Sequence, residues 1–226
     1  MMRFICVLLW LLYAVLFTGC ATRPPSPMFF METYHRKEIS DDRSNWGFSV
    51  IANLPSIYTY EHVPKDNYKD VNIYEYEIPV DFSFQYWRSV KSHFVWGVGG
   101  YLGDGFIYAG FAWDYFGMMA WSDFESLMVM LPTFGFFVPA FGFSTVEQIH
   151  ISKDISLGIS QHVEYNWFVS SYETNYYQEF AGGLYLLKRR GEGKKTIGLE
   201  LRYGKVFSEI YKLDGSHHLA IMLSFI

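Results

Sequence analysis

The sequence predicts an all-β protein, a closed antiparallel up-and-down β-barrel of about 8–10 strands that crosses a membrane. Three observations predict this fold class. Apolar and polar residues alternate, with breaks, from Asn45 to Ile226, as expected for strands with one apolar face. Half of the residues are hydrophobic and 20% are aromatic. No later stretch has the length and purity of a membrane-spanning helix, so the apolar residues are expected to lie on strands.

The start of the chain has the features of a signal peptide. Arg3 precedes an unbroken apolar run from Phe4 to Phe17, which matches the core of about 7–15 residues in signal peptides better than the ~20 residues of a membrane span. Gly19 and Cys20 follow. This ending resembles the lipobox of bacterial lipoproteins. The resemblance implies that residues 1–19 are removed and that Cys20 is acylated. An ordinary signal peptide that ends beside a cysteine is the alternative.

Cysteine content and charge exclude several classes of site and partner. The chain has two cysteines, Cys6 and Cys20, and removal of the signal peptide would leave only the second. The mature chain is therefore expected to contain no disulfide and no cysteine metal site. The net charge of the full sequence is −5 at pH 7, so we expect no nucleic-acid partner. The predicted cofactor set is empty apart from the covalent lipid on Cys20.

Between the predicted lipid anchor and the barrel lies a segment of different composition. Residues 20–44 are rich in proline and charge and show no steady period. We expect them to form the acylated cysteine and a tether, followed by the barrel domain at residues 45–226.

The clearest predicted strand runs from Tyr74 to Tyr86. Its even positions are apolar, with tyrosines at both ends, and its odd positions are mostly polar or acidic. Aromatic residues flanking an apolar band are typical of transmembrane barrel strands, and 13 residues tilted by about 45° span roughly 28 Å. The prediction places Val80 and Phe82 near the middle of the bilayer and the acids in the lumen. These acids are Glu75, Glu77 and Asp81.

The acidic row is interpreted as lumen lining rather than as a metal or cation-selective site. Buried carboxylates in small barrels are commonly paired with bases, and Arg202 faces inward in the predicted strand that also carries Glu200. No metal site is predicted.

Further strands are predicted at residues 155–169, 197–203 and 219–225, each with alternating apolar positions. Apolar positions are even before Gly103–Asp104 and odd after it, as a two-residue hairpin turn there requires. Residues 127–143 are apolar on both faces and receive no assignment; a thick strand, a plug or an external contact would fit. Counting this region once gives about nine strands, whereas single-chain bacterial barrels have an even number.

The alternating segments and the final strand, LAIMLSFI, resemble the small outer-membrane β-barrels of bacteria that have about eight strands. In that group the last strand ends in an aromatic residue that the barrel-assembly machinery reads; here Phe225 is penultimate. The resemblance implies location in the outer membrane, with membrane lipids and the barrel-assembly and lipoprotein-sorting machineries as partners. It leaves the oligomeric state open.

A soluble, lipid-tethered, lipocalin-like binding barrel is the competing architecture. Such a barrel has apolar residues inside and polar residues outside, the reverse of a membrane barrel. Alternation alone does not separate the two. The aromatic banding of residues 74–86 favours the membrane.

One group of polar residues on a single strand face suggests a catalytic site. Ser160, His162 and Glu164 share the polar face of one predicted strand, and serine, histidine and carboxylate together are used in acyl hydrolysis. Residues i and i+2 lie roughly 6.6 Å apart along a strand, beyond the hydrogen-bond reach of about 2.6–3.2 Å. We therefore expect no catalysis, and a structural, surface-contact or small-solute passage role. A lipid-modifying acyl hydrolase using Ser160 and His162 is the alternative.

Overall fold

The computed structural model describes residues 24–40, 44–54, 80–91, 93–101, 104–123, 140–169, 174–190, 195–207 and 217–226. Helix α2 (Pro27–Ser40) precedes the strands. The described strands are β1 (Ser44–Leu54), β2 (Val80–Lys91), β3 (Phe94–Tyr101), β4 (Asp104–Ala112), β5 (Phe116–Asp123), β6 (Phe141–Ser152), β7 (Ile155–Val169), β8 (Thr174–Arg189), β9 (Thr196–Phe207) and β10 (His217–Phe225).

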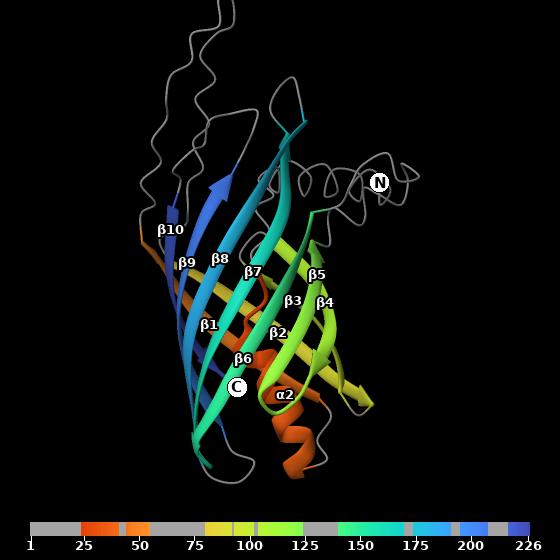
Figure 1. Cartoon of the computed structure of the whole chain (residues 1–226), viewed down its shortest axis with the longest axis vertical. Helices are drawn as coiled ribbons and strands as arrows, with labels where there is room; N and C mark the ends of the chain where they lie inside the picture. Colours follow the sequence, from red (N-terminus) through yellow and green to blue (C-terminus); the bar gives the residue numbers. More distant parts are fainter. Residues whose placement is uncertain are drawn as a thin grey trace, which may run out of the picture.

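The strands form a closed barrel in which each strand pairs with its sequence neighbours, and β1 pairs with β10 to complete the ring (Figure 1). All ten described pairings are antiparallel. At the closing seam Phe48 lies opposite Phe225 and Ala52 opposite Ile221. The predicted closed antiparallel barrel is confirmed. The described ring has ten strands, so the count of nine is wrong by one, and the barrel is larger than the eight-stranded type that it resembles.

The two ends of the barrel differ in their connections. At one end, the short-turn end, Trp113–Tyr115 joins β4 to β5, Lys153–Asp154 joins β6 to β7, and the chain finishes at Ile226. At the other end, the loop end, residues 55–79 join β1 to β2 and residues 124–140 join β5 to β6. Bacterial outer-membrane barrels have short periplasmic turns and longer extracellular loops.

The outer face of the wall is apolar. Nine of the ten described strands carry large, exposed hydrophobic side chains. Representative members are Phe48, Phe84, Val98, Phe111, Phe143, Ile159, Leu184, Leu201 and Leu223. Because successive strand residues point to opposite faces, the residues between them point into the lumen, as predicted for β7, β9 and β10.

The inner face carries the polar residues of the strands. Serines, carboxylates, amides and two arginines on this face are all buried. They include Ser49, Asp81, Gln85, Ser144, Gln148, Ser156, Ser160, His162, Glu164, Arg189, Glu200, Arg202 and Ser224. Among the described side chains, the outer face is therefore apolar, and the inner face combines these polar residues with buried apolar ones such as Trp87, Phe106 and Leu187.

The hairpin of β3 and β4 confirms the predicted change of parity. Val98 and Ile107 are paired and both exposed. The turn itself differs by one residue from the prediction. Tyr101 is paired with Asp104, so residues 102 and 103 form the two-residue connection, and Asp104 already belongs to β4.

The strand missing from the sequence-based count is β5. It begins after a turn made of Trp113, Asp114 and Tyr115, in which the amide of Trp113 donates to the carbonyl of Phe116. This turn contains one common turn residue, Asp114, between two aromatic residues and no glycine or proline. The sequence signal for a chain reversal is therefore weak here, and β5 is absent from the predicted count. Of the unassigned residues 127–143, the structure describes those from position 140, where β6 begins at Phe141.

The strand predicted at residues 74–86 is described only from Val80 onward, as β2. Val80 and Phe82 point outward, as predicted, but they lie at the loop end of β2 rather than near its middle. The central outward residue is Phe84, which is 52% exposed. Residues 74–79, including Glu75 and Glu77, lie outside the described residues.

Helix α2 occupies the lumen, which differs from the tether expected at residues 20–44. Its side chains from Met28 to Tyr34 are all buried, and Figure 1 shows the helix at the short-turn end of the barrel, where its last turns extend past the ends of β4 and β5. Ser26 precedes Pro27, and serine at the N-cap with proline at the first helical position is a helix-start pattern. The run Met28–Met31 is apolar on every side, as expected for a helix buried all round. No helix among the described residues is long and apolar enough to cross a membrane.

Candidate functional site

The occupied lumen is the candidate functional site, and three inward-facing glycines make room for α2. A Cβ atom on Gly47 would lie 2.6 Å from Phe29, one on Gly117 would lie 2.7 Å from Met31, and one on Gly198 would lie 2.5 Å from Met28. These glycines belong to β1, β5 and β9, so α2 meets the wall on three sides. The ring of Phe29 also stacks on Trp87, with centroids 4.6 Å apart. The wall and the helix are thus complementary in shape.

A buried ion pair, the Glu32 cluster, joins α2 to the short-turn end. One carboxylate oxygen of Glu32 accepts a hydrogen bond from Nε of Arg189 at 2.9 Å, and the other accepts from the Thr196 hydroxyl at 2.8 Å. A second guanidinium nitrogen lies 2.9 Å from Glu32. Arg189 also donates to Ser156 at 2.9 Å. Because Arg189 ends β8 and Thr196 begins β9, this cluster fixes α2 beside one specific turn.

A second group, the Glu200 cluster, holds the start of the helix deeper in the lumen. Arg202 donates two hydrogen bonds to Glu200, at 3.0 and 2.8 Å. The same arginine donates to the carbonyl of Pro24 at 3.0 Å, and the hydroxyl of Tyr101 donates to that carbonyl at 2.7 Å. Ser26 donates to Glu200 at 3.4 Å. Pro24 therefore lies close to the loop end of β3, where Tyr101 is the last residue.

Aromatic and histidine rings surround the helix residues that follow Glu32. Tyr34 stacks on His93 in the turn between β2 and β3, with centroids 5.3 Å apart. His35 lies 5.5 Å from the ring of His150. Partial burial, together with the nearby Arg189 charge, lowers the pKa of His35.

Ser160 and His162 are closer than the sequence analysis expects. The hydroxyl of Ser160 lies 2.9 Å from Nε2 of His162, and Nδ1 of the same ring is hydrogen-bonded to Ser144. The expectation that i and i+2 side chains stay apart is wrong here, because strand side chains lean along the strand direction and a concave barrel interior brings them together. All three side chains are at most 3% exposed.

This arrangement does not reproduce a hydrolase triad. The base needs a third group that orients it, and the printed partner of Nδ1 of His162 is the Ser144 hydroxyl rather than a carboxylate. Ser160 and His162 are at most 3% exposed. The contact orders the lumen wall between β6 and β7.

The other residues predicted to line the lumen lie on the inner face of the wall wherever the structure describes them. Asp81 is buried on the inner face of β2, and one of its carboxylate oxygens accepts from the Phe82 amide at 2.6 Å. Glu200 and Arg202 contact each other and the start of the helix segment. Glu75, Glu77 and Cys20 lie outside the described residues. Among the described histidines, cysteines, aspartates and glutamates, no three are grouped so as to hold a metal ion.

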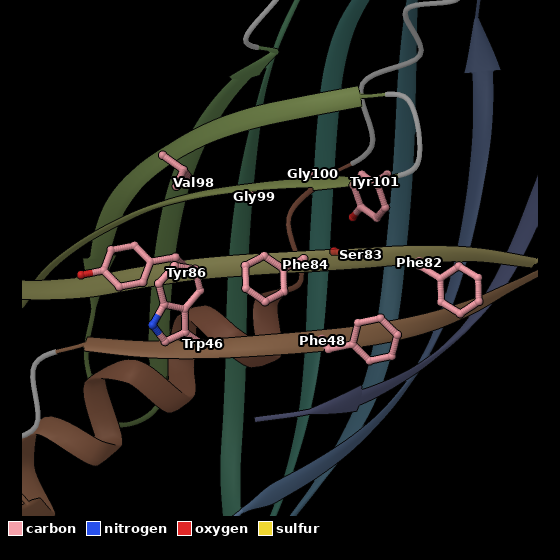
Figure 2. A pocket seen from close by; sticks show the side chains of 10 residues that line it. All are labelled: Trp46, Phe48, Phe82, Ser83, Phe84, Tyr86, Val98, Gly99, Gly100 and Tyr101. Carbon is pink, nitrogen blue, oxygen red and sulfur yellow. The ribbon is translucent and has the colours of Figure 1, made fainter.

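The outer face carries one described groove, the aromatic groove on β1, β2 and β3. Figure 2 shows the rings of Phe48, Phe82 and Phe84 projecting from β1 and β2, next to the bare backbone of Gly99 and Gly100. Phe84 is paired with Gly100, so a large ring stands beside a position without a side chain. The groove has a volume of about 470 Å³, within the usual range of about 300–1,000 Å³ for small-ligand sites. Its lining residues are Trp46, Phe48, Phe82, Ser83, Phe84, Tyr86, Val98, Gly99, Gly100 and Tyr101.

Comparison with known proteins gives a likeness in structure alone. No protein-family model and no curated protein matches the sequence. Two crystal structures of Ail, the attachment invasion locus protein of Yersinia pestis, are similar at 16% identity, covering 81% of this chain and 95% of Ail. The TM-score is 0.34 for Ail in complex with the heparin analogue sucrose octasulfate and 0.29 for Ail alone.

Glu32 and Arg189 are functional residues that the sequence analysis did not select. They lie 157 positions apart, and no local pattern links them. The Ser26–Pro27 helix start was the available signal, and the prolines and charges around it led to the tether interpretation instead.

Proposed function

We propose that this chain is an outer-membrane β-barrel lipoprotein with a structural or surface-contact role, whose lumen is closed by its own helix. The polarity of the wall carries the proposal. Large apolar side chains on nine described strands point outward, whereas the buried charged side chains of the wall, such as Glu200 and Arg202, point inward among buried aromatic residues. A membrane supplies the apolar surroundings that such an outer face requires. The two longest connections, residues 55–79 and 124–140, lie at one end, and those at the other end have at most six residues, which agrees with an outer-membrane orientation.

The same polarity argues against the soluble lipocalin-like alternative. A soluble barrel exposes polar residues and buries apolar ones between its strands. Here Phe84, Leu184 and Leu201 are about half exposed, while Glu200 and Ser49 are completely buried. In water, this outer face would form an apolar surface far larger than the few hundred Å² that soluble monomers show.

The position of helix α2 in the lumen argues against a function in which solutes pass through an open barrel. Its side chains from Met28 to Tyr34 fill the short-turn half of the lumen and are at most 6% exposed. The aromatic groove is instead accessible from the membrane side, and a lipid acyl chain matches its apolar, elongated surface. A contact role toward lipid or surface partners fits these two features.

A nitroxide at position 84 tests the membrane placement. In a bilayer, the relaxation of a label at Phe84→Cys should be enhanced strongly by oxygen, which dissolves in lipid, and weakly by a water-soluble nickel reagent. A label at Gln85→Cys, on the inner face of the same strand, should be shielded from both. Strong enhancement by nickel at position 84 would contradict the proposal, since it would place the outer face in water. Unchanged heat-modifiable gel mobility would show that both variants fold.

Acylation of Cys20 forms a separate part of the proposal. Labelled palmitate should enter the chain with Cys20 intact and should not enter the Cys20→Ser variant, because the thiol and the new N-terminus at residue 20 are the sites of lipid attachment. Cys6→Ser serves as the control and should be labelled normally. Equal labelling of Cys20→Ser would remove lipid attachment from the proposal and leave the barrel unaffected.

A further inference from the structure

The direction of α2 through the barrel has a consequence for the N-terminus. Glu32 contacts Arg189 and Thr196, which lie at the short-turn end. Eight residues earlier, the carbonyl of Pro24 accepts from the hydroxyl of Tyr101, the last residue of β3 at the loop end, and from Arg202 in the middle of β9. The chain therefore runs down the lumen from the loop end to the short-turn end, where β1 begins at Ser44.

The filled half of the lumen limits the end of the barrel at which a chain that precedes Pro24 can leave. The short-turn half of the lumen is filled by α2, whose Met28, Phe29 and Phe30 side chains are fully buried. A 14-residue helix is about 21 Å long. The four residues from Cys20 to Pro24 span at most ~14 Å even when fully extended. They are too short to return to the short-turn end, whereas the end of β3 is already beside Pro24.

We propose that the mature N-terminus emerges at the loop end of the barrel, so that the acylated Cys20 is anchored in the outer leaflet at the cell surface. This inference rests on the proposed outer-membrane barrel with a lipid on Cys20. In that barrel the loop end is extracellular. The anchor and the barrel then share one membrane, and the lipid chains lie on the opposite side from the C-terminus at Ile226.

Chemical labelling at three positions tests this arrangement. Arg23→Cys reports the N-terminal segment, Leu102→Cys the connection between β3 and β4 at the loop end, and Asp154→Cys the exposed turn between β6 and β7 at the short-turn end. Each variant is treated with a polymer-linked maleimide that is too large to cross the outer membrane, on intact and on permeabilised cells. The gel shift is then scored, and heat-modifiable mobility verifies folding.

We expect Arg23→Cys and Leu102→Cys to shift completely in intact cells and Asp154→Cys to shift only after permeabilisation. Labelling of Leu102→Cys in intact cells with Arg23→Cys protected would overturn the N-terminal exit and leave the barrel proposal standing. Protection of all three positions in intact cells would instead overturn the outer-membrane barrel, and the inference with it.

The parent chain supplies the remaining control. Its predicted mature form holds Cys20 as the one cysteine, and acylation consumes that thiol, so the parent should stay unshifted in intact and permeabilised cells. A shift of the parent would overturn the lipid anchor at the cell surface.

Discussion

Replacing Gly47 by leucine is expected to displace α2 within the lumen and to open a conducting path through the barrel. A Cβ atom at position 47 would lie 2.6 Å from the ring of Phe29 and 2.7 Å from that of Trp87. Both rings are fully buried and stacked on each other, so neither can rotate away. Overpacking of this kind costs about 1–3 kcal/mol, sometimes more, and movement of α2 relieves it without breaking any strand pairing.

Planar-bilayer recording measures this outcome. Discrete conductance steps should appear with Gly47→Leu and be absent from the parent. Gly182→Leu is the matched control, because Gly182 is exposed on the outer face and a Cβ there would meet only a backbone oxygen at 3.7 Å. Deletion of residues 24–40 gives the fully open reference. If the deletion variant folds and stays closed, the lumen is blocked by wall side chains, and the assignment of α2 as the closing element is wrong.

Replacing Glu32 by leucine is expected to destabilise the folded barrel by about 3–5 kcal/mol, because it leaves the Arg189 charge buried beside an apolar side chain. Glu32 is 1% exposed and Arg189 is 8% exposed, so water cannot replace the lost carboxylate. The midpoint of urea unfolding in detergent micelles should fall accordingly. Glu147→Leu, which removes an exposed carboxylate on the outer face of β6, should leave that midpoint nearly unchanged.

A double variant separates charge burial from packing. Replacing a buried ion pair with apolar residues of similar volume is often close to neutral, so Glu32→Leu combined with Arg189→Met should recover most of the lost stability. Equal losses in the single and double variants would show that the contacts of Glu32 with Thr196, rather than the unpaired charge, dominate the effect.

The wall of the barrel could be predicted because its signal is local. Alternation of apolar and polar residues assigns Leu199 and Leu201 to the outer face and Glu200 to the lumen, whatever the partner strands are. Alternation also assigned the outer and inner residues of β10 and of the hairpin of β3 and β4 correctly. It failed at the turn formed by Trp113 and Tyr115, where aromatic residues occupy positions usually held by turn formers.

The interior could not be predicted because its contacts are long-range. The buried part of helix α2, from Met28 to Tyr34, carries no alternation and no amphipathic stripe, since the wall contacts it on several sides. Its partners, such as Gly47, Gly117 and Arg189, look individually like ordinary strand residues. These residues contact one helix only because the strands close into a barrel. The fit of Phe29 against Gly47 therefore cannot be recognised until the strand pairing of the barrel is known.

The connection between α2 and β1 constrains the order of assembly. Three residues, 41–43, separate Ser40 from Ser44, and β1 is the strand that closes the seam with β10. The N-terminal segment must therefore already lie across the open, curved sheet when the first and last strands meet. Pairing of β1 with β10 then encloses the segment within the barrel. From that point on, the lipid-bearing N-terminus would stay at the loop end. Removing α2 from the finished barrel would require pulling it back along the lumen, because the closed ring prevents a sideways movement.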